Sequence, residues 1–172
     1  RHDIRVAVGS SMGGFAAVCF SRRLRLNHVL AYSPQFDASP QFDGRFAPVT
    51  QHLAWRHRIT PDSIAPDCAY CLVYDDQDYD SAHIAQLRAL IAPERVREIV
   101  LRHAGHATVY YLYETGHLKA VTVAALTGAP LPGRELRSNR RQSRQYLKTL
   151  SDRLAPRHPA LGRTAKAAGS SS

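Results

Sequence analysis

The stretch IRVAVGSSMGGFAAVCF, residues 4–20, decides the fold. Residues 4–8 are apolar except for Arg5 and rich in β-branched side chains, and this composition predicts a short strand. Residues 13–20 are apolar throughout and begin with small side chains, which predicts a buried helix that packs closely against a sheet. A strand that passes through glycines directly into a helix is typical of the start of a parallel β–α unit.

Ser11 occupies the turn of this unit and is the serine with glycine two residues before it and two residues after it. In a strand–turn–helix elbow the backbone is so tight that larger side chains at these offsets would collide, and the serine hydroxyl stands clear for attack. The amide of Met12 would lie at the helix N-terminus, where it could donate to an oxyanion. A nucleotide-binding loop would require a different glycine spacing or a Gly-Lys-Ser/Thr ending, and the turn has neither.

Strands and helices alternate along the rest of the chain. The expected strands are residues 28–32, 69–74 and 96–101, and the expected helices are residues 81–91 and 108–126. This order predicts an α/β fold with a parallel sheet and helices on both faces, a three-layer α/β/α arrangement.

The segment at residues 35–67 interrupts this alternation. It carries Pro, Asp, Gly and aromatic residues without a clear period, and we expect an irregular, cap-like excursion with one short helix near residues 51–57. We place the domain at residues 1–130. Residues 131–172 are expected to form a basic tail, with an exposed helix at 134–154 and disorder from 155.

A serine nucleophile requires a base, and in a Ser–acid–His chain order the base follows the last strand. His106 meets this condition, because it follows the strand expected at 96–101 and a glycine that permits a tight turn. Imidazole can accept and return a proton near neutral pH. His103, nearer to the strand, and His117, which we place inside the final helix, are the alternatives.

The acid of such a triad should follow the preceding strand, where residues 75–80 read DDQDYD. The usual spacing from the strand end favours Asp78. Asp75, at the strand edge, and Asp80, which could instead cap the following helix, remain alternatives. The loop lacks the glycine and terminal glutamate of a calcium-binding loop, so we expect no metal.

The composition limits the possible partners. The net charge is +9, and much of it lies in the last third of the chain. Because that segment matches no nucleic-acid motif and lacks interleaved aromatic residues, we expect a solvated surface and no nucleic-acid partner. No apolar run is long enough to span a membrane. Three cysteines at Cys19, Cys68 and Cys71 predict buried thiols in a reducing, cytoplasmic compartment.

The run VGSSMGGFAA at residues 8–17 resembles the nucleophile elbow of the α/β-hydrolase family, particularly of bacterial members, and AYSPQF at residues 31–36 is similar to members found beside polysaccharide-biosynthesis genes. The resemblance covers about residues 4–126 and implies the C-terminal half of such a fold. It implies Ser11 as nucleophile, an Asp of the 75–80 loop as orienting acid and His106 as base. The first strands and the upstream oxyanion-hole loop of that family have no counterpart, so we expect a fragment of a longer protein that lacks part of the substrate pocket.

The expected activity is that of a serine hydrolase, of carboxylesterase or deacylase type, acting through an acyl-enzyme without a cofactor. The expected substrate is a small-molecule ester or an acylated saccharide. The alternative is a non-catalytic, hydrolase-like module that binds an acidic partner or a glycan through its basic tail. The sequence leaves the oligomeric state open.

Overall fold

The computed structural model describes residues 3–52, 54 and 56–156. Its centre is a sheet of four strands, which are β1 (Val6–Ser10), β2 (His28–Tyr32), β3 (Ala69–Tyr74) and β4 (Val96–Val100). The strands are all parallel and follow one another in chain order across the sheet. The predicted parallel sheet is therefore confirmed, and the predicted bounds of β2 and β3 agree with the structure.

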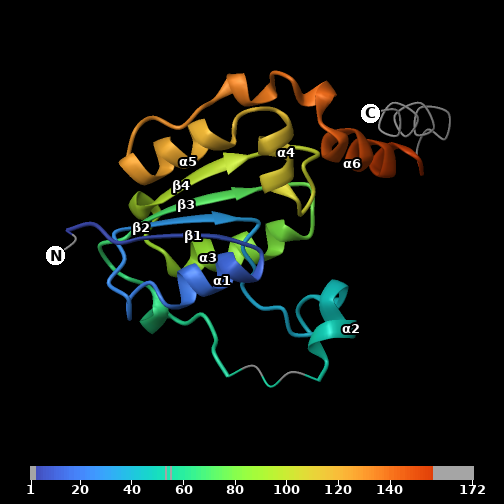
Figure 1. Cartoon of the computed structure of the whole chain (residues 1–172). Helices are drawn as coiled ribbons and strands as arrows, with labels where there is room; N and C mark the ends of the chain where they lie inside the picture. Colours follow the sequence, from blue (N-terminus) through green and yellow to red (C-terminus); the bar gives the residue numbers. More distant parts are fainter. Residues whose placement is uncertain (1–2, 53, 55, 157–172) are drawn as a thin grey trace.

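Helices cover both faces of this sheet (Figure 1). Helices α1 (Met12–Cys19) and α3 (Asp80–Leu90) lie on one face, and α4 (Thr108–Glu114) and α5 (Leu118–Thr127) lie on the other. The short 3₁₀ turn η3 (Pro93–Arg95) leads from α3 into β4.

The central strands contribute side chains to both layers, because successive residues of a strand point to opposite faces. In β2, for example, Val29 packs on the α1/α3 side and Leu30 on the α4/α5 side. This arrangement explains why the strand sequences are continuously apolar.

Two element predictions need correction. The helix expected over residues 108–126 is two helices, because the chain breaks after α4 at Thr115–His117 and Gly116 adopts a φ of +77°. Helices commonly end on a left-handed glycine of this kind. The first strand also runs later than expected, to Ser10, so the turn that follows it consists of Ser11 alone.

Among its described residues, the irregular excursion contains short helical turns and no strand. These are η1 (Gly44–Phe46), α2 (Ala47–Thr50) and η2 (Pro61–Ser63). The short helix expected near residues 51–57 is thus found a few residues earlier, at α2, and residues 53 and 55 lie outside the described part of the chain.

The basic segment after residue 131 does not form the exposed helix that we expected at 134–154. It forms η4 (Arg134–Arg137), η5 (Arg140–Gln142) and α6 (Arg144–Leu154), and Leu136 and Tyr146 are buried in the core on the α4/α5 side. The segment therefore packs on the sheet domain. The disorder expected from residue 155 falls almost entirely on residues 157–172, which lie outside the described residues.

The three cysteines are buried and unpaired, as the sequence predicts. Burial raises the pKa of Cys68 and of Cys71 to about 11, so both are protonated thiols at neutral pH. Among the described helices, none has the length and apolar character needed to cross a bilayer.

Candidate functional site

Ser11 lies in a strained turn between β1 and α1. Its φ of 54° and ψ of −119° fall outside the regions that L-residues normally occupy. The amide of Ser11 donates to the carbonyl of Tyr32 at 2.9 Å, which continues the β1–β2 ladder up to the turn. Strain of this kind persists only where surrounding structure enforces it, and it is concentrated at functional sites.

The glycines around Ser11 differ in whether the fold leaves room for a side chain. A Cβ atom on Gly9 would lie 2.2 Å from the carbonyl oxygen of Gly13, and one on Gly14 would lie 2.9 Å from Cβ of Pro34. A Cβ atom on Gly13 would contact nothing within 4 Å. The expected collision therefore applies to Gly9 but not to Gly13. The backbone of Gly13 lies close to Gly9, whereas a side chain on Gly13 itself would have room.

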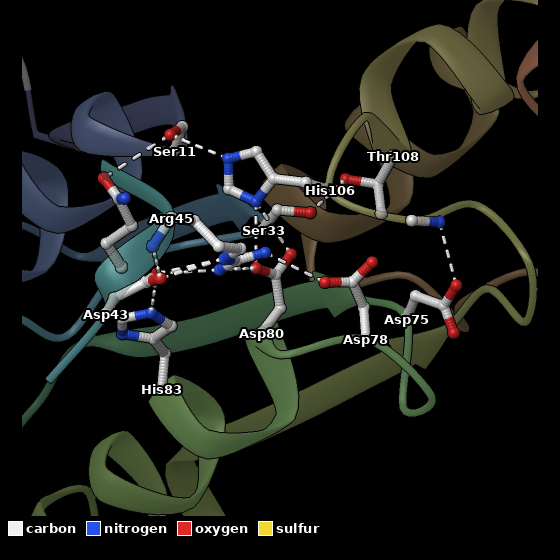
Figure 2. Close-up of polar contacts among 12 residues, drawn as sticks. Ser11, Ser33, Asp43, Arg45, Asp75, Asp78, Asp80, His83, His106 and Thr108 are labelled. Atoms are coloured by element: carbon white, nitrogen blue, oxygen red, sulfur yellow. Dashed lines mark hydrogen bonds and ion pairs between the residues drawn. The ribbon is translucent and has the colours of Figure 1, made fainter. Parts of the chain in front are cut away.

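His106 reaches Ser11 from the loop after β4. Its Nε2 atom lies 2.9 Å from Oγ of Ser11 (Figure 2). Gly105, with a φ of +59°, turns the chain in front of this histidine, and its amide donates to the buried carboxylate of Asp75 at 2.8 Å. Asp75 also accepts from Arg153 at 2.8 Å, so it anchors the loop that presents the imidazole.

The carboxylate on the far side of the imidazole belongs to Asp80. Both of its oxygens lie 2.9 Å from Nδ1 of His106, and its side chain is fully buried at the start of α3. The prediction of Asp78 as the acid is wrong in this geometry, because Asp78 pairs instead with Arg45 at 2.9 Å. Figure 2 shows Asp80 below the ring, with Asp78 and Asp75 successively farther from it.

Arg45, in η1, holds the acidic residues together. Its guanidinium donates to Asp43, Asp78 and Asp80 and lies over the rings of Phe46 and Tyr79. Burial opposes ionisation of Asp80, but hydrogen bonds from His106 and Arg45 outweigh it and lower the pKa of that carboxyl. The carboxylate is therefore charged where it contacts the imidazole. This role of Arg45 was not predicted from the sequence.

A second histidine, His83, is fully buried and contacts the carboxylate of Asp43 that pairs with Arg45. Nδ1 of His83 accepts from the amide of Phe36 at 2.9 Å, and its Nε2 lies 2.9 Å from Asp43. Since a backbone amide can only donate, the proton of the neutral ring is on Nε2 and is donated to Asp43. Burial lowers the pKa of His83, which keeps the ring neutral. The sequence analysis missed this His83–Asp43–Arg45 relay, which joins the excursion to α3.

Two groups could stabilise negative charge beside Ser11. Met12 is the first residue of α1, and a first-turn amide has no partner within its helix. Gln35, which the sequence analysis also missed, is 1% exposed, and its Oε1 lies 3.4 Å from Oγ of Ser11. Its Nε2 is buried and has no hydrogen-bond partner among the described residues.

The side-chain amide of Gln35 is better placed as a donor than as an acceptor. The single hydroxyl hydrogen of Ser11 is committed to Nε2 of His106 whenever that nitrogen is unprotonated. A carbonyl oxygen beside Oγ then has nothing to accept. Half a turn of the amide would bring its NH₂ group to the serine oxygen and leave no repulsion between lone pairs.

The other candidate histidines lie elsewhere. Nδ1 of His103 contacts Arg153 at 3.2 Å, and Nε2 of His117 lies 3.0 Å from Oγ of Ser138. His117 precedes α5 and is not inside a helix, contrary to our expectation. Within residues 3–52, 54 and 56–156, no group of three His, Cys, Asp or Glu side chains is arranged to hold a metal ion.

The arrangement brings together a hydroxyl, an imidazole and a charged carboxylate in one hydrogen-bonded line. Such a line can activate the hydroxyl for attack on an electrophilic carbon, because the imidazole removes the proton and the carboxylate stabilises the imidazolium. Comparison with protein-family models and with curated proteins found no match to this chain.

Proposed function

We propose that this chain carries the catalytic centre of a serine hydrolase that cleaves esters, with Ser11 as nucleophile, His106 as base and Asp80 as orienting acid. One observation carries the proposal, namely the continuous line from Oγ of Ser11 through both imidazole nitrogens to Asp80, with 2.9 Å at each step. The strained backbone of Ser11 supports it. The α/β-hydrolase assignment, which rests on the resemblance of residues 8–17, is part of the same proposal.

Each step of the reaction follows from these positions. His106 takes the proton of Ser11 through Nε2 while Oγ attacks the ester carbonyl, and Asp80 stabilises the resulting imidazolium through Nδ1. The Met12 amide and the NH₂ group of Gln35 donate to the oxyanion. The imidazolium then protonates the departing alkoxide. Water next attacks the acyl group on Ser11 with His106 as base. The imidazolium returns this proton to Oγ of Ser11 as the carboxylic acid leaves.

The proposed substrate is a small ester or an acylated saccharide. Phe46 packs against the ring of His106 at a centroid distance of 5.7 Å, so the excursion lies close enough to the base to shape the space around the leaving group. The proposal places the protein in the cytoplasm, where its three unpaired thiols would stay reduced.

Hydrolysis of p-nitrophenyl acetate by the full chain and by its Ser11→Ala variant tests the proposal. We expect the variant to lose more than about 10³-fold in kcat/KM and to lose labelling by a fluorophosphonate. Ser10→Ala is the matched control, because Ser10 is the adjacent exposed serine at the end of β1 and should keep both properties. Equal hydrolysis by wild type and Ser11→Ala would refute the proposal.

A further inference from the structure

A cavity of about 710 Å³ lies beside the end of β4, away from the catalytic line. None of Ser11, Asp80 and His106 lines it. Its wall comes from the loop after β4, from α4 and from the basic segment that includes η4 and η5. The floor consists of Tyr111, Leu136 and Tyr146, which are all buried.

The side chains that line this cavity carry more positive than negative charge. Four arginines line it, at Arg102, Arg134, Arg137 and Arg140. The carboxylate among the lining residues is Asp76, and it pairs with Arg102 at 3.3 Å. Within the described part of the chain, no ion pair involves the other three arginines.

The fold holds in place the backbone that carries these exposed arginines. Leu136 is buried between Arg134 and Arg137, and its carbonyl accepts from the hydroxyl of Tyr111 at 3.1 Å, which anchors η4 to α4. The guanidinium of Arg140 lies 5.5 Å from the ring centre of Tyr146. Like charges held close together repel one another, and a bound anion would relieve this repulsion.

His103 also lines the cavity. Its pKa is lowered mainly by burial and by the charge of Arg153. Asp75 opposes this effect, and Arg140 and Arg102, two arginines of the cavity, add to it. The imidazole is therefore close enough to the cavity arginines to respond to a bound anion.

We propose that this cavity is a binding site for a small multivalent anion that bears two or more phosphate groups, held by Arg134, Arg137 and Arg140. A guanidinium binds phosphate oxygens through two parallel hydrogen bonds. One phosphate monoester carries a charge of about −2, so three unpaired guanidinium groups match a ligand with at least two phosphates. The limited volume of about 710 Å³ and the tyrosine floor favour a small ligand over an extended polyanion.

Calorimetric titration of the full chain with inorganic pyrophosphate at physiological salt tests the site. We expect saturable binding that the double variant Arg134→Gln/Arg137→Gln weakens at least tenfold. Arg23→Gln is the control, because Arg23 is an exposed arginine outside the cavity and should leave the affinity within twofold. Arg134→Lys/Arg137→Lys keeps the charge and should bind with intermediate affinity.

A second readout is the imidazole of His103, followed by NMR across a pH titration. Bound pyrophosphate should raise its pKa, because the anion offsets the neighbouring arginines. The proposal is overturned if pyrophosphate does not bind, if the double variant binds as tightly as wild type, or if heparin or RNA binds through these arginines while pyrophosphate does not. None of these measurements depends on ester hydrolysis, so the result is independent of the proposed catalytic function.

Discussion

Asp80 and Asp78 differ by two positions in the sequence, but only Asp80 contacts His106. We expect Asp80→Asn to lower kcat/KM for p-nitrophenyl acetate by about 10³–10⁴-fold, because the imidazole loses its tautomer control and its charge partner. Asp78→Asn changes charge equally but affects only the ion pairs with Arg45 and Arg153, and it should reduce kcat/KM by less than about tenfold. A larger loss in Asp78→Asn than in Asp80→Asn would reverse the assignment.

Counting from the strand end could not identify this acid. The residues after β3 form a turn in which the amide of Asp78 donates to the carbonyl of Asp75, and this turn directs Asp78 toward Arg45. Arg45, which pairs with the carboxylates of Asp78 and of this acid, belongs to the excursion, a segment without any periodic pattern. By contrast, Ser11 and His106 followed from local glycines and chain order alone, which require no knowledge of distant contacts.

Gln35 combines a buried, unsatisfied amide with contact to the proposed nucleophile. We expect Gln35→Met to raise the free energy of unfolding by about 1 kcal/mol, because a buried amide whose hydrogen-bonding groups are only partly satisfied is removed. The same change should lower kcat by about 10²-fold with little effect on KM, because an oxyanion donor acts in the transition state. Urea unfolding and steady-state kinetics on one preparation measure both effects.

The two effects of Gln35→Met have opposite signs, and this separates the proposed role from simple packing. A packing residue would lose stability and activity together. If Gln35→Met is less stable than wild type, or if its kcat is unchanged, the amide has no role at the oxyanion.

The elbow between β1 and α1 leaves room for a side chain at one of its two flanking glycines but not at the other. Gly9→Ala should lower the free energy of unfolding by about 1–3 kcal/mol, because the added Cβ would overlap the backbone of Gly13. Gly13→Ala should be neutral or stabilising by up to about 1 kcal/mol, since its Cβ meets open space and alanine favours a helix. Urea unfolding of both variants measures the difference, and equal losses would show that the crowding is symmetric.

The sequence predicts the bounds of a strand or helix well where the apolar pattern within that segment is sufficient. The bounds of β2 and β3 could be predicted because both strands are continuously apolar and buried between two layers. The break between α4 and α5 was missed because apolar residues continue on both sides of it, although Gly116 was an available signal. The turns η4 and η5 were missed because a single buried leucine among arginines carries no period.

Contacts between residues that are far apart in the sequence hold the basic segment on the sheet domain. The parallel sheet was predictable from the alternation of elements, but the return of the basic segment onto the domain was not. Arg153 of α6 pairs with Asp75 beyond β3, and Gln145 donates to the carbonyl of Ala104 at 2.7 Å. Through these contacts α6 supports the loop that carries His106.

The buried Asp43–His83 pair should make the stability of the whole molecule depend on pH. Burial opposes ionisation of Asp43, but hydrogen bonds from Arg45 and His83 lower its pKa from the ordinary 3.8 to about 2. A carboxyl with a depressed folded-state pKa stabilises the protein above its unfolded pKa, by about 2 kcal/mol here, and this contribution is lost as the pH falls from about 4 to about 2. The pKa of His83 is also depressed, so the unfolded chain takes up its proton first and stability already decreases as the pH falls below about 6.5.

Urea unfolding of wild type, Asp43→Asn and His83→Gln between pH 8 and pH 2.5 tests this two-step loss. Wild type should lose stability in both ranges. His83→Gln should be less stable at pH 8 and lose less between pH 7 and pH 5, because the titrating ring is gone. Asp43→Asn should differ most from wild type near pH 7 and approach it as the pH falls toward 2.5, where the carboxyl of Asp43 is protonated in the unfolded chain and begins to be protonated in the folded protein. A constant difference between wild type and Asp43→Asn over that acid range would mean that Asp43 does not hold its charge through Arg45 and His83.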